Sequence, residues 1–176
     1  MAGMAYPAYK RLKRYAIIGL FISMTAFAGC APVISQKTLD TVDRAAVFKD
    51  VQAEPARYAD RPVLFGGAII AVENLTGATY VEVMQQPLNS RLKPVDPGNT
   101  QGRFIAVFKG FKDPAIYAPG RLLTVAGKVF GSQTRPLGKM DYRYPLIEVS
   151  EDHLWPGPGE SASPGVSIGL GVGVYR

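Results

Sequence analysis

The side chain with the most distinctive chemistry in this chain is Cys30, its only cysteine. It follows the small residues Ala28 and Gly29, which come after an apolar run, Ala16–Phe27, preceded by a basic cluster. A basic region, a short apolar region and small residues before a cleavage point are typical of a secretory signal peptide. A thiolate is a good nucleophile and can be joined to a diacylglyceryl group. We therefore expect Cys30 to be a lipid-attachment site, which cleavage between Gly29 and Cys30 leaves at the N-terminus.

The apolar run is too short to span a membrane as a helix. It has about 12 residues, whereas a spanning helix needs roughly 20. The alternative interpretation is an anchor that is not cleaved and carries an incidental cysteine. Phe27 lies where bacterial lipoproteins usually have Leu, and it keeps the large apolar character of that position. A lipid anchor of two or three acyl chains would hold the protein at the membrane permanently.

The residue after the cysteine indicates which membrane is involved. It is Ala31, and not the Asp that commonly retains lipoproteins at the inner membrane of Gram-negative bacteria. We therefore expect a lipid-anchored protein at the cell outer membrane, facing the periplasm, with envelope proteins or lipids as partners. A single cysteine allows no disulfide within the chain.

The formal charge of +6 comes mostly from the leader. Without its four basic residues, 16 basic and 14 acidic residues remain, a balance of about +2. Nucleic-acid binding depends on neutralising many phosphates with basic side chains. We therefore expect no nucleic-acid partner.

The composition divides the chain into four segments. We expect a cleaved signal peptide at 1–29, a lipidated tether at 30–42, a β-domain at 43–155, and a Pro/Gly-rich linker with a Gly-alternating tail at 156–176. The tail would be either a flexible extension or a strand that adds to a sheet edge or contacts a membrane or partner.

The apolar pattern after residue 61 has the period of β-strands. A helical pattern at Asp43–Gln52 precedes it and ends before Pro55. Turn-forming residues separate the strand-like runs, and the last of these turns is expected at Gly131–Gly138. The five runs are Pro62–Val72, Thr79–Gln86, Gly102–Phe108, Arg121–Phe130 and Tyr144–Val149. Five short strands after one helix predict a small β-barrel or sandwich.

A pair of glycines, Gly66 and Gly67, lies within the first of these runs. Paired glycines could allow the backbone of a ligand to approach closely. They could also form a bulge or bend that closes a small barrel, which is the interpretation we favour.

Several short segments occur in an order that resembles the Slp family of Gram-negative outer-membrane lipoproteins. The resemblance extends from about Cys30 to Trp155. The segments that carry it are Glu54–Tyr58, Val63–Ile69, Tyr80–Val83, Gln86–Leu88, Gly102–Phe104, Gly120–Gly127, Tyr142–Pro145 and Leu154–Trp155. It implies a mainly β fold, a small five- to six-stranded OB-like barrel with one short N-terminal helix. It also implies a role in stress or envelope maintenance, and it supplies no defined reaction.

Five side chains are candidates for contacts with a ligand. Arg103 and Arg121 each begin an apolar strand, and guanidinium groups bind phosphates through paired hydrogen bonds. Alternatively, they pair with carboxylates at strand ends, or they cover apolar surface with their stems and keep the charged head in water. Tyr142, Tyr144 and Trp155 could stack on sugars or bases, or they could cap the barrel core.

The sequence offers little for catalysis. His153 is the only histidine, and it lies beside Glu151 and Asp152 as surface histidines often do. No group of His, Cys, Asp and Glu has the spacing of metal ligands. We expect no catalytic, metal-binding or cofactor-binding residues, and the covalent lipid as the only added group. The expected role is structural or stress-related, through protein or lipid contacts. The alternative is a binding module for saccharide or lipopolysaccharide.

The lipid attachment predicts that Cys30→Ser removes both the acyl chains and the membrane association. Mass spectrometry of the N-terminal peptide, from membranes separated on a density gradient, measures both. Wild-type protein should give an acylated peptide that begins at Cys30, in the outer-membrane fraction. An unmodified or soluble wild-type protein would contradict the assignment.

Overall fold

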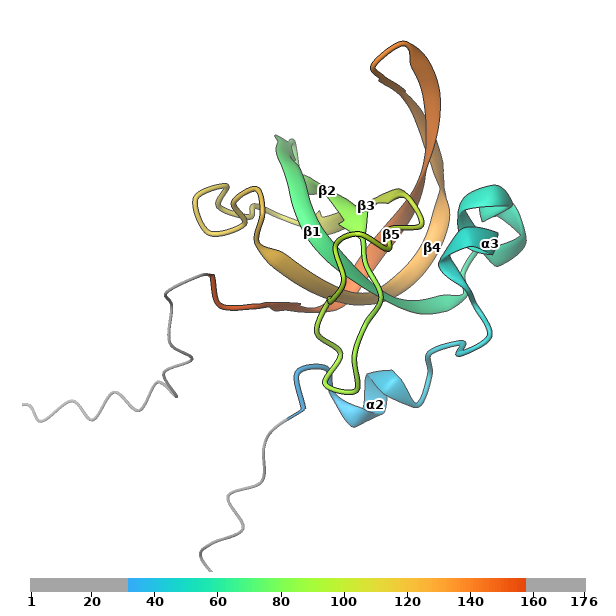
Figure 1. The fold of residues 1–176 in the computed structure, drawn as a ribbon, viewed down its shortest axis with the longest axis vertical. Coiled ribbons are helices and arrows are strands. Elements are labelled where there is room, and N and C mark those ends of the chain that lie inside the picture. Colours follow the sequence, from blue (N-terminus) through green and yellow to red (C-terminus); the bar gives the residue numbers. More distant parts are fainter. Residues whose placement is uncertain (1–31, 158–176) are drawn as a thin grey trace, which may run out of the picture. The chain divides into compact units, whose positions relative to one another are not determined.

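Five strands close into a barrel in the computed structural model, which describes residues 32–157 (Figure 1). The strands are β1 (Pro62–Leu75), β2 (Ala78–Gln85), β3 (Arg103–Lys109), β4 (Leu122–Leu137) and β5 (Met140–Leu154). Their order around the barrel is β1-β2-β3-β5-β4, and β4 pairs back onto β1. Only β3 and β5 run parallel. This is the order of an OB-fold, so the expected fold class is confirmed.

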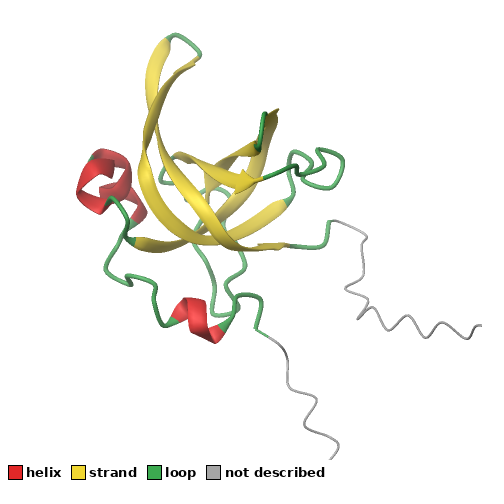
Figure 2. Ribbon diagram, turned by 180° about the vertical axis from the view of Figure 1, so that it is seen from behind, coloured by secondary structure: helices red, strands yellow, loops and turns green. Residues whose placement is uncertain are grey.

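The alternation of side chains explains why these segments form strands. In β2, Thr79, Val81 and Val83 are buried, whereas the intervening Tyr80 and Glu82 are half-buried on the outer surface. Period-two alternation of this kind gives each strand one face for the core and one for the surroundings. The strongly curved ribbon of strands is evident in Figure 2.

All five predicted strands are present, but one predicted turn is wrong. Residues 131–137, within the expected turn Gly131–Gly138, continue β4, and the chain reverses only at Gly138 and Lys139. The register between β4 and β5 shifts between Val129 and Gly131. Gly131 therefore marks a bulge inside a long strand, a role that a glycine in a sequence does not distinguish from a turn.

Within the described residues, three short helices precede the barrel. They are α2 (Gln36–Leu39), α3 (Phe48–Ala53) and the 3₁₀ helix η1 (Pro55–Tyr58). The helix expected at Asp43–Gln52 begins later, because Asp43 forms a turn in which its carboxylate accepts from the backbone N–H of Ala45.

The first turn of α3 closes the barrel core with aromatic side chains. Phe48 is buried, and its ring meets that of Phe65 at 5.2 Å edge-on and that of Phe104 at 5.9 Å. Edge-to-face contacts at this separation are favourable beyond the area that they bury. The connection between β3 and β4, residues 110–121, contains turns and no helix. Among the described residues, α3 is therefore the helix that covers the Phe65–Phe104 end of the core.

The segment before α2 lies against the barrel. Ile34 is fully buried, and Ser35 donates from both its backbone N–H and its hydroxyl to the Glu151 carboxylate, at 2.7 and 2.9 Å. Burial alone would raise the pKa of Glu151, but the hydrogen bonds from Thr38 and Ser35 lower it below its ordinary value. Part of the expected tether, 30–42, is thus packed on the domain. Cys30, the leader and most of the tail at 156–176 lie outside the described residues.

The paired glycines are positions where backbones approach each other. A Cβ on Gly67 would overlap the carbonyl oxygen of Met84 on β2. A Cβ on Gly66 would come within 2.8 Å of the Leu123 carbonyl oxygen on β4 and of the Leu88 side chain. Protein atoms therefore occupy the space over both glycines, which supports a role in barrel closure over contact with a ligand.

Candidate functional site

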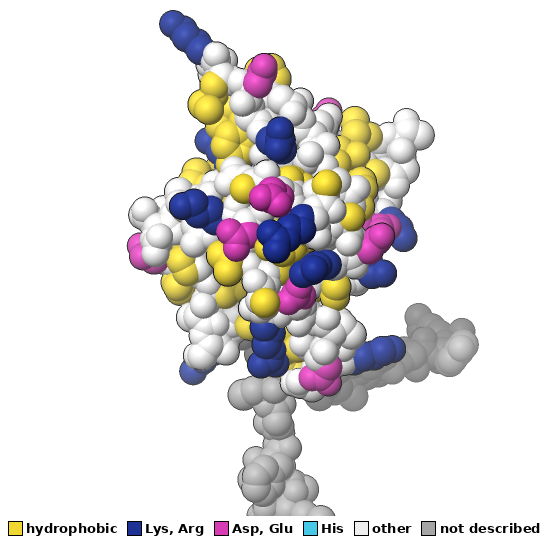
Figure 3. Space-filling view, turned by 90° about the vertical axis from the view of Figure 1, so that its right-hand side faces the viewer, with side chains coloured by type: hydrophobic (Ala, Val, Ile, Leu, Met, Phe, Trp, Pro, Cys, Tyr) yellow, Lys and Arg dark blue, Asp and Glu magenta, His cyan; other side chains and the backbone are white. Residues whose placement is uncertain are grey.

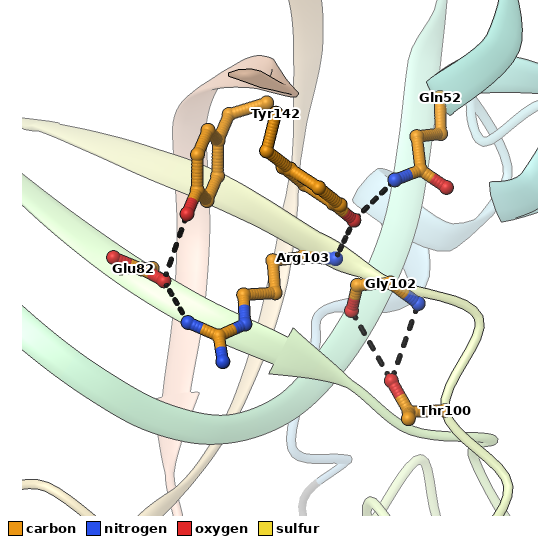
Figure 4. Close-up of polar contacts among 7 residues, drawn as sticks. Gln52, Glu82, Thr100, Gly102, Arg103 and Tyr142 are labelled. Carbon is orange, nitrogen blue, oxygen red and sulfur yellow. Dashed lines mark hydrogen bonds and ion pairs between the residues drawn. The ribbon is translucent and has the colours of Figure 1, made fainter. Parts of the chain in front are cut away.

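The outer face of β2, β3 and β5 carries a connected group of polar and aromatic side chains (Figure 4). Arg103 forms an ion pair of 2.7 Å with Glu82, and the Tyr144 hydroxyl donates to the same carboxylate at 3.3 Å. The Tyr142 ring meets the Tyr144 ring edge-on at 4.7 Å. We call these four residues, Glu82, Arg103, Tyr142 and Tyr144, the outer cluster.

The outer cluster is connected to α3 through the hydroxyl of Tyr142. This oxygen accepts from the backbone N–H of Arg103 at 2.8 Å and from the side-chain amide of Gln52 (Figure 4). Gly102 has a φ of +138°, and a Cβ there would come within 2.7 Å of the Gln52 amide. Only glycine combines that backbone conformation with the close approach. This explains the Gly102-Arg103 pair noted in the sequence.

Electrostatics hold the outer cluster together without a ligand. The pKa of Arg103 is raised above its ordinary value. The main cause is the hydrogen bond to Glu82, which outweighs the lowering effect of partial burial. Burial, and then the charge of Glu82, raise the pKa of Tyr144, so its hydroxyl remains a donor at neutral pH. An anion that binds Arg103 would have to compete with Glu82. The ion pair is the pairing with a carboxylate that we gave as the alternative to anion binding.

A small hollow lies beside the outer cluster. It has a volume of about 60 Å³ and is lined by residues that include Tyr80, Glu82 and Arg135. The Arg135 guanidinium lies 5.7 Å from the centre of the Tyr80 ring and forms an ion pair of 2.9 Å with Glu73. Sites for drug-sized ligands usually enclose about 300 Å³ or more. This hollow is far below that size.

Arg121 and Trp155 lie together at the opposite end of β5 from Tyr142 and Tyr144. The Arg121 guanidinium donates to the Trp155 carbonyl oxygen at 2.7 Å and to the Ile116 carbonyl oxygen at 3.2 Å. The Trp155 indole N–H donates to the Thr124 hydroxyl at 3.0 Å. The structure thus divides the five candidates into two groups, Arg103 with the two tyrosines and Arg121 with Trp155.

The connection between β3 and β4 contains a third group of side chains that the sequence did not indicate. Lys112 donates to the Tyr117 hydroxyl at 2.9 Å and to Asp152 at 3.3 Å, and that hydroxyl donates to Asp152 at 2.8 Å. The Lys112 ammonium also lies 4.6 Å from the centre of the Phe108 ring. Lys112 and Asp152 are 40 positions apart in the sequence, and only the fold brings them together.

The backbone of this connection is fixed as well. The Lys112 N–H donates to the Thr79 hydroxyl at 3.0 Å, and the Asn74 amide donates to the Lys112 carbonyl oxygen at 3.2 Å. Asp113 accepts from the backbone N–H groups of Ala115 and Tyr117. We call residues 110–121, held in this way, the clamped loop.

The clamped loop exposes two large apolar side chains. Phe111 is 72% exposed and Ile116 is 52% exposed. Because the backbone of this loop is already fixed, contact of these side chains with a partner requires no further ordering of the loop.

In the described part of the chain, the titratable groups form no arrangement typical of nucleophilic catalysis. Burial lowers the pKa of Lys112, but the hydrogen bond to Tyr117 and the charge of Asp152 raise it above its ordinary value, so the amine stays protonated. His153 packs edge-on against Trp155 at 4.6 Å between ring centres, and burial lowers its pKa. Among residues 32–157, no three His, Cys, Asp or Glu side chains gather to hold a metal ion.

The surface shows no field of a single sign on the face drawn in Figure 3. Basic and acidic side chains alternate there, with apolar groups between them. Within the described range, no helix is long and apolar enough to cross a membrane.

A closed five-stranded barrel in OB order, without a catalytic or metal arrangement in the described part, defines a small OB-like domain. The sequence model of the outer membrane lipoprotein Slp family matches residues 27–167 of this chain. The chain belongs to this family and is an outer-membrane lipoprotein.

Three relatives illustrate the match. The chain is 31% identical over 105 residues to the uncharacterized lipoprotein YeaY of Escherichia coli K12, covering 60% of this chain and 54% of the relative. It is 32% identical over 108 residues to the outer membrane protein Slp of the same organism, and the match covers 61% of this chain and 57% of that relative. An uncharacterized protein of Haemophilus influenzae is 26% identical over 141 residues, covering 78% and 76%. The chain thus spans little more than half of the two E. coli relatives.

Solved structures resemble the barrel only distantly. A small single-stranded DNA-binding protein of Streptomyces coelicolor matches with a TM-score of 0.33 and 9% identity, covering 54% of this chain and 94% of that one. A TM-score of this size supports no conclusion about ligands.

The outer cluster predicts that Tyr142→Phe destabilises the domain by about 1–2 kcal/mol, since the Arg103 N–H and the Gln52 amide lose their acceptor. Urea unfolding of the protein that begins at residue 31 measures the change. Tyr80→Phe is the matched control, because the Tyr80 ring keeps its contact with Arg135, and its effect should stay within about 0.5 kcal/mol. Equal effects of the two changes would contradict the role given to the Tyr142 hydroxyl.

Proposed function

We propose that this lipoprotein has no enzymatic activity and maintains the envelope through contacts with envelope proteins or lipids. In this proposal Cys30 carries the lipid and the barrel faces the periplasm. Membership of the Slp family supports the anchor. The hydrogen bond to Tyr117 and the charge of Asp152 keep Lys112 protonated, so its amine is not poised as a nucleophile.

The observation that carries the proposal is the clamped loop. Phe111 follows Gly110 and precedes Lys112, whose backbone and side chain are both fixed by hydrogen bonds to the barrel. The exposed side chain of Phe111 contributes little to the stability of the domain itself, because most of its surface remains in water. Contact with a partner would bury it at low entropic cost.

A second function is favoured by the outer cluster. OB-folds commonly bind oligonucleotides or oligosaccharides on the face of strands 2 and 3, where Glu82 and Arg103 lie with the two tyrosines. A saccharide or a lipopolysaccharide phosphate is the ligand class that would suit these side chains. The competing ion pair and the small adjacent hollow make this the weaker candidate.

Complementation of a gene deletion tests the proposal. The deletion strain should be sensitive to detergent or acid under nutrient limitation, and wild-type protein should restore resistance. We expect the double variant Phe111→Ser, Ile116→Ser to accumulate normally at the outer membrane and fail to restore resistance. Met140→Ser, at another exposed apolar residue, is the matched control and should restore it.

A third variant separates the two functions. Arg103→Ala should restore resistance if the clamped loop acts, and should fail if the outer cluster binds the required ligand. Full restoration by the clamped-loop variant, or a deletion strain with an unaltered barrier, would contradict the proposed function.

A further inference from the structure

We propose that the end of the barrel where Ile34 holds the chain, and where Ser35 and α2 are exposed, contacts the membrane surface, and that the β4–β5 hairpin is held away from it. We call these two ends the α2 pole and the hairpin pole. The partner of the α2 pole is a lipid headgroup surface. The inference rests on the proposed attachment of lipid to Cys30.

The first step is the fixed position of the chain at the α2 pole. Ile34 is fully buried, so it cannot leave the domain without exposing its side chain to water. The Glu151 carboxylate accepts from Ser35 twice, and the Ser35 hydroxyl also accepts from the backbone N–H of Thr38. The chain is thus held to the barrel only four residues after the lipid-bearing cysteine.

The second step is the reach of those four residues. A fully extended chain covers at most about 3.6 Å per residue, so Cys30 and Ile34 cannot be separated by more than about 14 Å. A domain of roughly 120 residues has a radius of gyration of about 13.5 Å and hence a diameter near 35 Å. The tether keeps the attached pole within about 14 Å of the membrane surface, and the domain cannot enter the membrane. For a body about 35 Å across, the opposite pole therefore stays about 20 Å or more from that surface.

The third step is which part of the domain lies opposite. In Figures 1 and 2, α2 lies at the bottom of the barrel and the β4–β5 hairpin rises at the top. Pairing of β4 with β1 ends at Lys128, and pairing of β5 with β3 begins at Leu146. The strand segments 131–137 and 140–145 therefore have only each other as strand partners, over about 20 Å at 3.4 Å per residue.

A single-thiol experiment tests this arrangement in the complete lipidated protein. Because lipid occupies the Cys30 thiol and the chain has no other cysteine, Lys37→Cys and Lys139→Cys each introduce one reactive thiol. Both positions are exposed, the first in α2 and the second in the hairpin turn. Each variant is labelled with a fluorophore and reconstituted into phosphatidylcholine vesicles that carry a headgroup-attached nitroxide quencher.

We expect loss of most of the fluorescence at position 37 and no loss at position 139. Inserting ten Gly and Ser residues between Ala31 and Pro32 adds about 17 Å of average reach, and it leaves the described fold untouched. This insertion should reduce the quenching at position 37 markedly. Equal quenching at the two positions, stronger quenching at position 139, or an insertion without effect would overturn the orientation.

Flotation of the same vesicles separates failure of the orientation from failure of the anchor. Protein that floats but shows equal quenching at both positions overturns the orientation alone. Protein that does not float overturns the lipid at Cys30, and this inference with it. The Cys30→Ser protein, labelled at position 37, should neither float nor be quenched.

Discussion

Closure of the barrel is the constraint on which the other features depend. The strand β1 pairs with β4 along its first half and with β2 along its second half, and both pairings meet at Gly67 and Ala68. A side chain on Gly67 would push β1 away from β2. Because the ring of strands is closed, the core residues that Phe48 packs against are held in place. The strands that carry the outer cluster are held in place in the same way.

The sequence predicted the elements better than the contacts between them. The five strands and the OB-like barrel follow from local patterns and from family resemblance, and the fold is confirmed, whereas lipid attachment at Cys30 stays a prediction. The extent of β4 was underestimated because Gly131 at a bulge is indistinguishable in sequence from a glycine in a turn. The packing of Ile34 was not predicted either, since one apolar residue has no periodicity.

The candidate site illustrates the same limit. Arg103, Tyr142 and Tyr144 do come together, but their partner Glu82 reaches them only through the pairing of β2 with β3 and of β3 with β5. The clamped loop was missed because Lys112 and Asp152 meet across 40 residues of sequence. A loop without periodicity gives no sign that it is rigid, and exposure of Phe111 is visible only in three dimensions.

The central claim is that the clamped loop makes contact with an envelope partner. Photo-crosslinking in intact cells, with a photoreactive amino acid at position 111 in the lipidated protein, tests it most directly. We predict a discrete crosslinked species at position 111 and none at position 140, another exposed apolar position, which lies in the hairpin. The same pattern at both positions, or no adduct at position 111, would contradict the account.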